Sequence, residues 1–265
     1  KLNTQTRDAR NREVLETFVE FGAPPEVAYL NKPHVGSDRL REVVRNMRRF
    51  ILERGGEIRF HCRLEDVLLR GGALQGVLLR DVRTGREERV DACELVLAVG
   101  HSARDTFRML HGRGFAMQAR EFAVGVRIEH LQEKIDIAQY GRKRGALPVA
   151  DYKLVSHAGE RTAFTFCMCP GGYVMPAASE AGGVVTNGMS DYARDAVNAN
   201  SALLAQVRLS DFDRGGVLDG VEFQRALERA AFRAGGGGYA APVQRAEDFL
   251  LGRRTSAFGE VLPSY

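Results

Sequence analysis

The sequence has no tryptophan, only four cysteines and no long apolar run. A helix that crosses a bilayer needs about 20 consecutive apolar residues, so we expect no membrane span. Four cysteines in a chain of 265 residues are too few for the disulfide framework of a small secreted domain. We therefore expect thiols and a reducing, cytoplasmic setting.

Sequence motifs of several enzyme classes are also missing. The absence of H-E-x-x-H, G-x-x-x-x-G-K, an EF-hand loop and a Ser-His-Asp order leaves hydrolase and kinase hypotheses without support. Residues 235–240 match G-x-G-x-x-A, but they follow a predicted helix, whereas a dinucleotide-binding fingerprint follows a strand. We interpret residues 235–238 as a helix cap and hinge, and nucleotide binding there is the weaker alternative.

Lysine is scarce, so the basic character of the chain comes from arginine. The net charge is +4 and the isoelectric point is about 9.0, while lysine occurs only at positions 1, 32, 134, 143 and 153. The arginines are scattered among acidic residues and form no block, which disfavours a nucleic-acid partner. Those at 41, 45, 48 and 49 share a helix with an apolar stripe and indicate an ordinary amphipathic helix.

The pattern of apolar residues predicts an α/β fold that becomes α+β in its second half. Helical periodicity occurs at 11–21, at 38–54 after the N-cap candidates Ser37 and Asp38, and at 220–234. Strand-like segments of a β-meander occur at 58–60, 64–69, 76–83 and 89–93. Short strands at 122–129, 153–156, 162–169, 172–177 and 184–187 predict a second, antiparallel sheet.

Residues 94–105 are the most informative stretch. They predict an apolar strand that stops at Gly100 and opens into the start of a helix. A strand that ends in glycine lets its backbone approach a bound ligand, and amides at a helix start can face a phosphate or a flavin edge. His101 is a candidate proton donor in the same loop.

Two further polar groups are candidate site residues. Strand alternation would put Cys167 and Cys169 on one face, before a turn at 170–172 that has little side-chain cover and admits a ligand. Buried core thiols are the simplest interpretation, and a thiol pair facing a redox cofactor or substrate is the alternative. A metal site is not predicted, because structural zinc needs four ligands and this pair offers two. Asn187 and Asn198 either satisfy turns or line a substrate pocket.

Several motifs in order resemble those of the uncharacterised FAD-dependent dehydrogenases, also described as NAD(FAD)-utilising, glutathione-reductase-like flavoproteins. The resemblance runs nearly end to end and rests on residues 1–4, 31–39, 97–105, 122–130, 167–172 and 221–225. In that family a G-x-G-x-x-G segment precedes the part that matches Lys1, and a glycine-rich segment follows the part that matches Tyr265. The resemblance therefore implies an internal part of a longer chain, which would bind FAD poorly and be inactive by itself.

The resemblance also implies domains and sites. Residues 1–112 would form part of the FAD-binding domain, 113–252 an antiparallel substrate or cap domain like that of geranylgeranyl reductases, and 253–265 a return towards the first. FAD would contact Lys1, Leu2, Asn3, Thr4, Leu64, Gly100 and His101. Cys167, Cys169, Asn187 and Asn198 would line the substrate side, and the sequence identifies no catalytic residue.

The expected activity is FAD-dependent transfer of hydride or electrons to or from a small-molecule substrate. NAD(P)H is a candidate electron donor. The alternatives are a non-catalytic binding module and a flavoprotein that acts on RNA. RNA binding that weakens steeply as the salt concentration rises would favour these alternatives over a small-molecule reductase.

Overall fold

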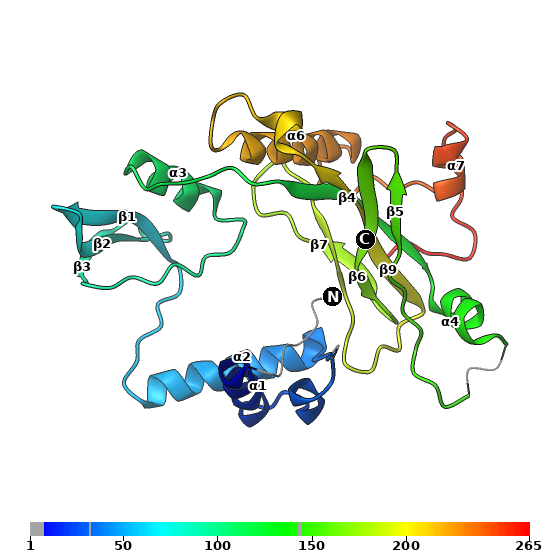
Figure 1. The fold of residues 1–265 in the computed structure, drawn as a ribbon, viewed down its shortest axis with the longest axis horizontal. Coiled ribbons are helices and arrows are strands. Elements are labelled where there is room, and N and C mark those ends of the chain that lie inside the picture. Colours follow the sequence, from blue (N-terminus) through cyan, green and yellow to red (C-terminus); the bar gives the residue numbers. More distant parts are fainter. Residues whose placement is uncertain (1–7, 32, 143–144) are drawn as a thin grey trace. The chain divides into compact units, whose positions relative to one another are not determined.

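The computed structural model describes residues 8–31, 33–142 and 145–265 of the chain (Figure 1). The chain folds into two compact units. Unit 1 comprises Lys1–Arg54, Glu121–Arg208 and Arg225–Tyr265, and unit 2 comprises Gly55–Arg120 and Leu209–Gln224. The expected combination of helices with antiparallel sheets is confirmed. The predicted boundaries at 112 and 252 stay a prediction.

Unit 1 begins with two helices that share a small apolar core. Helix α1 (Ala9–Glu20) starts where the Asp8 carboxylate accepts the Arg10 N–H at 3.0 Å. A short 3₁₀ turn (Pro25–Ala28) leads to α2 (Ser37–Glu53). Ala23, Val27 and Val43 are buried together between these elements. Both helices match the predicted ones to within a few residues.

The predicted N-cap of α2 is wrong. The capping position is Gly36, at φ +86°, and no side chain caps the helix. Ser37 Oγ instead donates to Asp191 Oδ1 at 2.8 Å, and Asp38 Oδ1 accepts the Tyr192 N–H at 2.9 Å. The two side chains therefore fasten the helix start to a distant turn of unit 1, because tertiary partners compete with local capping.

The main sheet of unit 1 has the order β4-β9-β6-β5, and all its pairs are antiparallel (Figure 1). Its strands are β4 (Phe122–Leu131), β5 (Val155–Ala158), β6 (Arg161–Cys169) and β9 (Asn198–Val207). A separate ribbon pairs β7 (Tyr173–Pro176) with β8 (Thr186–Met189). Most of these strands were expected, but β9, which lies between β4 and β6, was not.

Strand β6 is irregular at the cysteines. The register with β9 shifts between Phe166 and Cys169, and Cys167 has a φ of +51°. A bulge of this kind breaks the two-residue alternation of side chains. The argument that alternation puts Cys167 and Cys169 on one face therefore fails for this strand.

Two helices and the larger part of a third complete unit 1. Helix α4 (Gln132–Tyr140) follows β4 directly, and α7 (Ala246–Leu250) lies near the end of the chain. Helix α6 (Asp219–Ala234) confirms the helix expected at 220–234, and the glycines after it end it as expected. Arg225 of α6 makes a bidentate pair with Glu180, with both N–O distances at 2.7 Å. This pair and the Val184 N–H bond to the Glu228 carbonyl attach α6 to the 180–184 segment.

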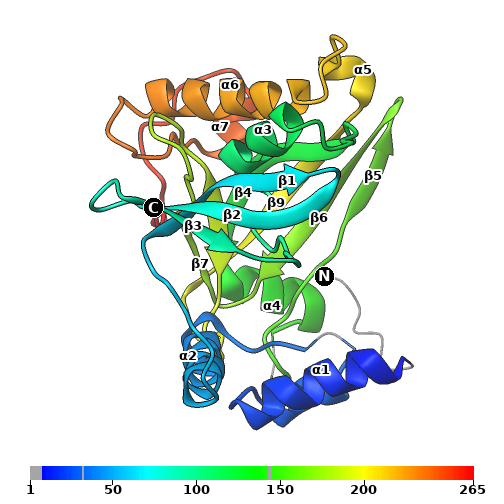
Figure 2. The ribbon, with the colours of Figure 1, turned by 90° about the vertical axis from the view of Figure 1, so that its left-hand side faces the viewer.

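Unit 2 contains the expected β-meander, whose strands lie side by side in Figure 2. They are β1 (Cys62–Arg70), β2 (Ala73–Asp81) and β3 (Glu87–Asp91), followed by α3 (Arg104–Gly112). The short helix α5 (Leu209–Phe212) and the first residues of α6 also belong to this unit. Val67 and Val77 are buried and lie opposite each other on β1 and β2.

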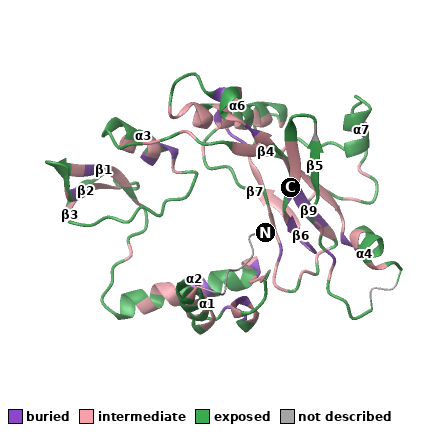
Figure 3. Cartoon of the chain, in the orientation of Figure 1, coloured by how far each residue is buried: buried purple, intermediate pink, exposed green. Residues whose placement is uncertain are grey.

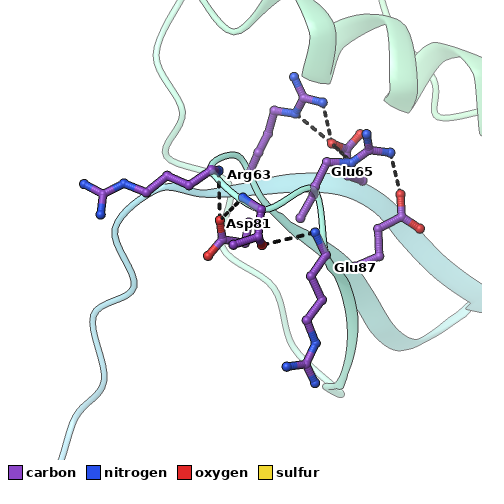
Figure 4. A network of polar contacts seen from close by, with 8 residues as sticks. Arg63, Glu65, Asp81 and Glu87 are labelled. Atoms are coloured by element: carbon purple, nitrogen blue, oxygen red, sulfur yellow. Dashed lines mark hydrogen bonds and ion pairs between the residues drawn. The ribbon is translucent and has the colours of Figure 1, made fainter.

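Alternating charges cover part of this meander. Glu65 accepts from Arg63 at 2.8 Å and lies 2.9 Å from Arg80, which also pairs with Glu87 (Figure 4). Asp81 accepts two backbone N–H groups of the turn that follows it, which lowers its pKa. The network ties the three strands together along one surface.

Two predicted strands of unit 2 are wrong. Residues 58–60 and 94–99 form no strand. The loop between β3 and α3 is largely exposed (Figure 3), and Val96 within it is 90% exposed. A strand exists only when another backbone supplies its hydrogen bonds, and no described strand pairs with either segment. The apolar pattern therefore indicated strand propensity without the partner that a strand requires.

The β4–β9 pairing depends on a glycine. A Cβ on Gly125 would lie 1.9 Å from the Leu203 carbonyl oxygen, whereas a Cβ on Gly112 would meet nothing within 4 Å. We expect Gly125→Ala to lower the free energy of unfolding by about 1–3 kcal/mol, because the backbone of β9 must shift. Gly112→Ala is the control and should leave it unchanged or slightly higher. Urea unfolding measures both, and equal stabilities would contradict this account of the sheet.

Candidate functional site

Polar side chains interrupt one face of the β4–β9 pair. Directly opposite residues of antiparallel strands share a face, and the register pairs Glu129 with Asn200, Arg127 with Ala202 and Leu131 with Asn198. Arg127, Glu129, Asn198 and Asn200 therefore lie on the same side of the sheet. We name these four residues the polar face.

Amides hold the Arg127 guanidinium in place. Its Nη1 donates to Asn200 Oδ1 at 2.6 Å, and its Nη2 donates to Asn187 Oδ1 at 3.4 Å. A Cβ on Gly188 would lie 2.0 Å from Asn200 Oδ1 and 2.2 Å from Arg127 Nη1. The glycine therefore leaves the room that this hydrogen bond occupies.

The Glu129 carboxylate is held by different partners. Asn198 Nδ2 donates to Glu129 Oε1 at 3.0 Å and to the Leu262 carbonyl at 3.0 Å. The backbone N–H of Ser264 donates to Glu129 Oε2 at 3.0 Å. Asn187 and Asn198, which we predicted on the substrate side, thus contact two alternate residues of β4 and meet at the polar face.

The two predicted cysteines adjoin this region through the β6–β9 ladder. Cys169 lies opposite Asn200, and its Sγ donates to the Cys167 carbonyl at 3.2 Å. Both side chains are half-buried thiols, neither in a disulfide. Burial lowers the pKa of Arg194, and the nearby Asp151 and Cys169 act in the opposite direction. The Arg194 guanidinium therefore lies within electrostatic reach of the Cys169 thiol.

The glycine turn after the cysteines is packed against protein, so the expectation of an open approach for a ligand is wrong. A Cβ on Gly171 would lie 1.8 Å from the Arg194 carbonyl oxygen, and one on Gly172 would lie 2.2 Å from the Met189 carbonyl oxygen. The Gly171 N–H donates to Gln132 Oε1 at 2.8 Å, and that of Gly172 donates to the Asn198 carbonyl at 2.7 Å. Backbone takes the space that sequence reasoning assigned to a ligand.

A histidine and a tyrosine form a second polar group in unit 1. His130 Nε2 and the Tyr152 hydroxyl share a hydrogen bond of 2.8 Å. Burial lowers the pKa of His130, so its neutral form is favoured. Burial raises the pKa of Tyr152, against the opposing effects of Ser201 and Arg127. The pair therefore keeps the phenol proton in place over a wide range of pH.

Three buried side-chain atoms near these groups have no hydrogen-bond partner among the described residues. They are His130 Nδ1, Arg194 Nε and Asn200 Nδ2. Buried polar atoms of native proteins are nearly always hydrogen bonded, to protein, water or ligand. Unit 1 therefore contains a polar region with unused hydrogen-bonding capacity, which makes it the candidate substrate site.

Sequence reasoning missed Arg127, His130 and Tyr152. A signal was present for Arg127. Charged residues at 127 and 129 alternate inside an otherwise apolar strand, and amides at 198 and 200 show the same two-residue period. Polar residues with that period in a buried strand mark one face of a sheet. No comparable pattern identifies Tyr152.

The residues predicted to contact FAD fall outside unit 1 or outside the described residues. Lys1, Leu2, Asn3 and Thr4 lie in the segment that the structure does not describe. Leu64 is half-buried on β1, and Gly100 and His101 are exposed in unit 2. Gly100 has a φ of +73°, and a Cβ there would meet nothing within 4 Å.

The start of α3 tests whether this loop fits FAD. The Arg104 N–H donates to the Ser102 carbonyl, and the Thr106 N–H donates to Asp105 Oδ1 at 2.9 Å. Both amides therefore already form hydrogen bonds within the protein. The negative charge of the Asp105 carboxylate would also repel a phosphate group. The helix start does not fit a pyrophosphate, whereas the backbone at Gly100 is open.

The described part of the chain also has two open hollows. One of about 420 Å³ in unit 1 is lined in part by Glu180, Tyr239 and Tyr265. Another of about 480 Å³ in unit 2 is lined in part by Cys62 and Asp81. Neither contains a residue that we predicted for the site. Among the described residues, no group of three or more His, Cys, Asp or Glu side chains is placed to hold a metal ion, and no helix has the length and apolarity to cross a membrane.

Comparison with known proteins identifies the family. Residues 121–265 match the family described as "FAD-dependent protein, C-terminal domain-like". The chain is 46% identical over 269 residues to an uncharacterized protein of Clostridium beijerinckii, and the alignment covers 100% of this chain and 49% of that protein. The chain thus spans about half the length of this relative. It belongs to the family of FAD-dependent proteins whose C-terminal domain matches it.

His130 makes stability depend on pH. Because its folded pKa is lowered, the unfolded chain binds the proton first, and stability is lost as the pH falls from about 6.5 through the folded pKa. We expect His130→Gln to reduce the dependence of the free energy of unfolding on pH in this range. His111→Gln, at an exposed position, is the control and should leave that dependence unchanged. Urea unfolding at a series of pH values measures the slopes. An unchanged slope in His130→Gln would contradict the effect of burial.

Proposed function

We propose that this chain forms the substrate-holding part of a FAD-dependent oxidoreductase, which passes hydride or electrons between flavin and a small-molecule substrate. The observation that carries the proposal is the match of residues 121–265 to a FAD-dependent family. That range contains the polar face, both cysteines of β6 and the His130–Tyr152 pair. The activity of the whole protein, its dehydrogenase character and its electron donor NAD(P)H are parts of this proposal.

The residues of this chain have separate roles in the proposed reaction. FAD, when bound, supplies the hydride or electron transfer. Leu64, Gly100 and His101 are assigned to the flavin, together with Lys1, Leu2, Asn3 and Thr4. Cys167, Cys169, Asn187 and Asn198 are assigned to the substrate side. The polar face orients the substrate, and its residue Asn200 on β9 is shielded from water.

The His130–Tyr152 pair lies on the other face of the sheet. His130 and Ser201, the two partners of the Tyr152 hydroxyl, alternate with Glu129 and Asn200 along β4 and β9. Hydride transfer to a carbon–carbon or carbon–oxygen double bond needs a proton at the second atom. For a substrate held at the polar face, we therefore do not assign that proton to Tyr152.

The cofactor assignment is tested on the purified full-length protein. We expect the visible absorbance of oxidised flavin, which NADH or NADPH bleaches in the absence of oxygen. Heat-released cofactor should be FAD by chromatography. A colourless protein that takes up no FAD on incubation would contradict the proposal. Tight, salt-sensitive binding of tRNA by the flavin-loaded protein would favour action on RNA instead, because phosphate contacts weaken steeply with salt.

A further inference from the structure

We propose that Arg127 binds a carboxylate group of the substrate, and that Asn200 and Asn187 position its guanidinium for this contact. The inference rests on the proposed function, in which the polar face lies on the substrate side. It goes further, because it assigns the substrate to the class of carboxylic acids. Arg127 lies on β4 beside β9, within unit 1 (Figure 1).

Among the residues that the structure describes, none forms an ion pair with Arg127. A guanidinium keeps its positive charge and carries five N–H donors. Two of the Arg127 nitrogens, Nη1 and Nη2, donate hydrogen bonds to the side-chain oxygens of Asn200 and Asn187. Both acceptors are neutral amides. Glu129, two residues along the same face, is engaged by Asn198 and Ser264. Burying part of an unpaired charge is costly, and an anionic ligand removes that cost.

Asn200 supplies an independent observation. Its side chain is 0% exposed, and its Nδ2 has no partner among the described residues. The amide orientation follows from the hydrogen bond, since only Oδ1 can accept from Arg127. Nδ2 is therefore a buried donor next to the guanidinium. The Arg127 guanidinium and Asn200 Nδ2 are therefore two adjacent sets of N–H donors. A carboxylate has two acceptor oxygens and can bind both sets at once.

The surroundings bear on the size and the charge of this place. A Cβ on Gly188 would overlap the Arg127–Asn200 contact, so this position admits no side chain. Arg194, whose Nε also has no partner among the described residues, lies within electrostatic reach of Asp151 and of Cys169, which is opposite Asn200 in the sheet. Asn187 is exposed, so the guanidinium can be reached from the side of β8. These features favour a flat anion over a bulky one.

The test uses benzoate as the carboxylate probe and benzamide as its neutral counterpart. Line broadening of the probe in NMR spectra gives the dissociation constant for the full-length, flavin-loaded protein. We expect benzoate to bind at least tenfold more tightly than benzamide. Arg127→Gln should weaken benzoate at least tenfold, whereas Arg229→Gln, which removes the same charge from an exposed position of α6, should leave it unchanged.

A second variant separates positioning from charge. Gly188→Ala keeps Arg127 but displaces its contact with Asn200, so we expect benzoate to bind several-fold more weakly with the melting temperature within a few degrees of wild type. Undetectable benzoate binding, equal losses in Arg127→Gln and Arg229→Gln, or tighter binding of inorganic phosphate would overturn the inference. Flavin absorbance is recorded throughout, because its absence from wild type would defeat the proposed function instead.

Discussion

The pairing of β9 with both β4 and β6 is the constraint on which unit 1 depends. Its ladder with β4 runs the full length of both strands and puts Asn200 opposite Glu129, while the other side puts Cys169 opposite Asn200. A slip of one residue would move Asn198 and Asn200 to the opposite face of the sheet. Arg127 would then lose its amide support, and Glu129 would lose Asn198. The register of β9 against β4 and β6 therefore decides which side chains meet at the site.

The two units use arginine in different ways. On the meander of unit 2, Arg63 and Arg80 pair with glutamates at the surface, where each pair adds little to stability because water screens it (Figure 4). In unit 1, the buried Arg225 has a bidentate partner in the half-buried Glu180 and fastens a helix. Arg127 has neither arrangement, since amides hold its geometry and leave its charge available. A guanidinium held in this way is suited to recognition rather than to stability.

The spacing of apolar residues predicted those helices and strands that are stabilised by burial of their own apolar face. The helices at 37–53 and 219–234 and the meander were predicted close to their observed bounds. It failed at β9, because Asn198, Asn200 and Ser201 have the composition of a turn and form a strand only between two partners. It failed in the opposite sense at 94–99, where an apolar segment has strand propensity but no described neighbour to pair with. Pairing is a property of two backbones, and one segment does not contain it.

By itself, the sequence determined the mixed helix and antiparallel-sheet character, because composition and spacing act locally. It also proposed the candidate residues Asn187, Asn198, Cys167 and Cys169. The tertiary structure alone decided what those residues contact. It joined Asn187 to Arg127 and Asn198 to Glu129, and it closed the glycine turn at 171–172 with backbone from 189 and 194. It also revealed Asn200 as a buried donor and gave Arg127 amide partners with no counter-ion among the described residues. Such contacts join residues far apart in the chain that come together only when β9 enters the sheet.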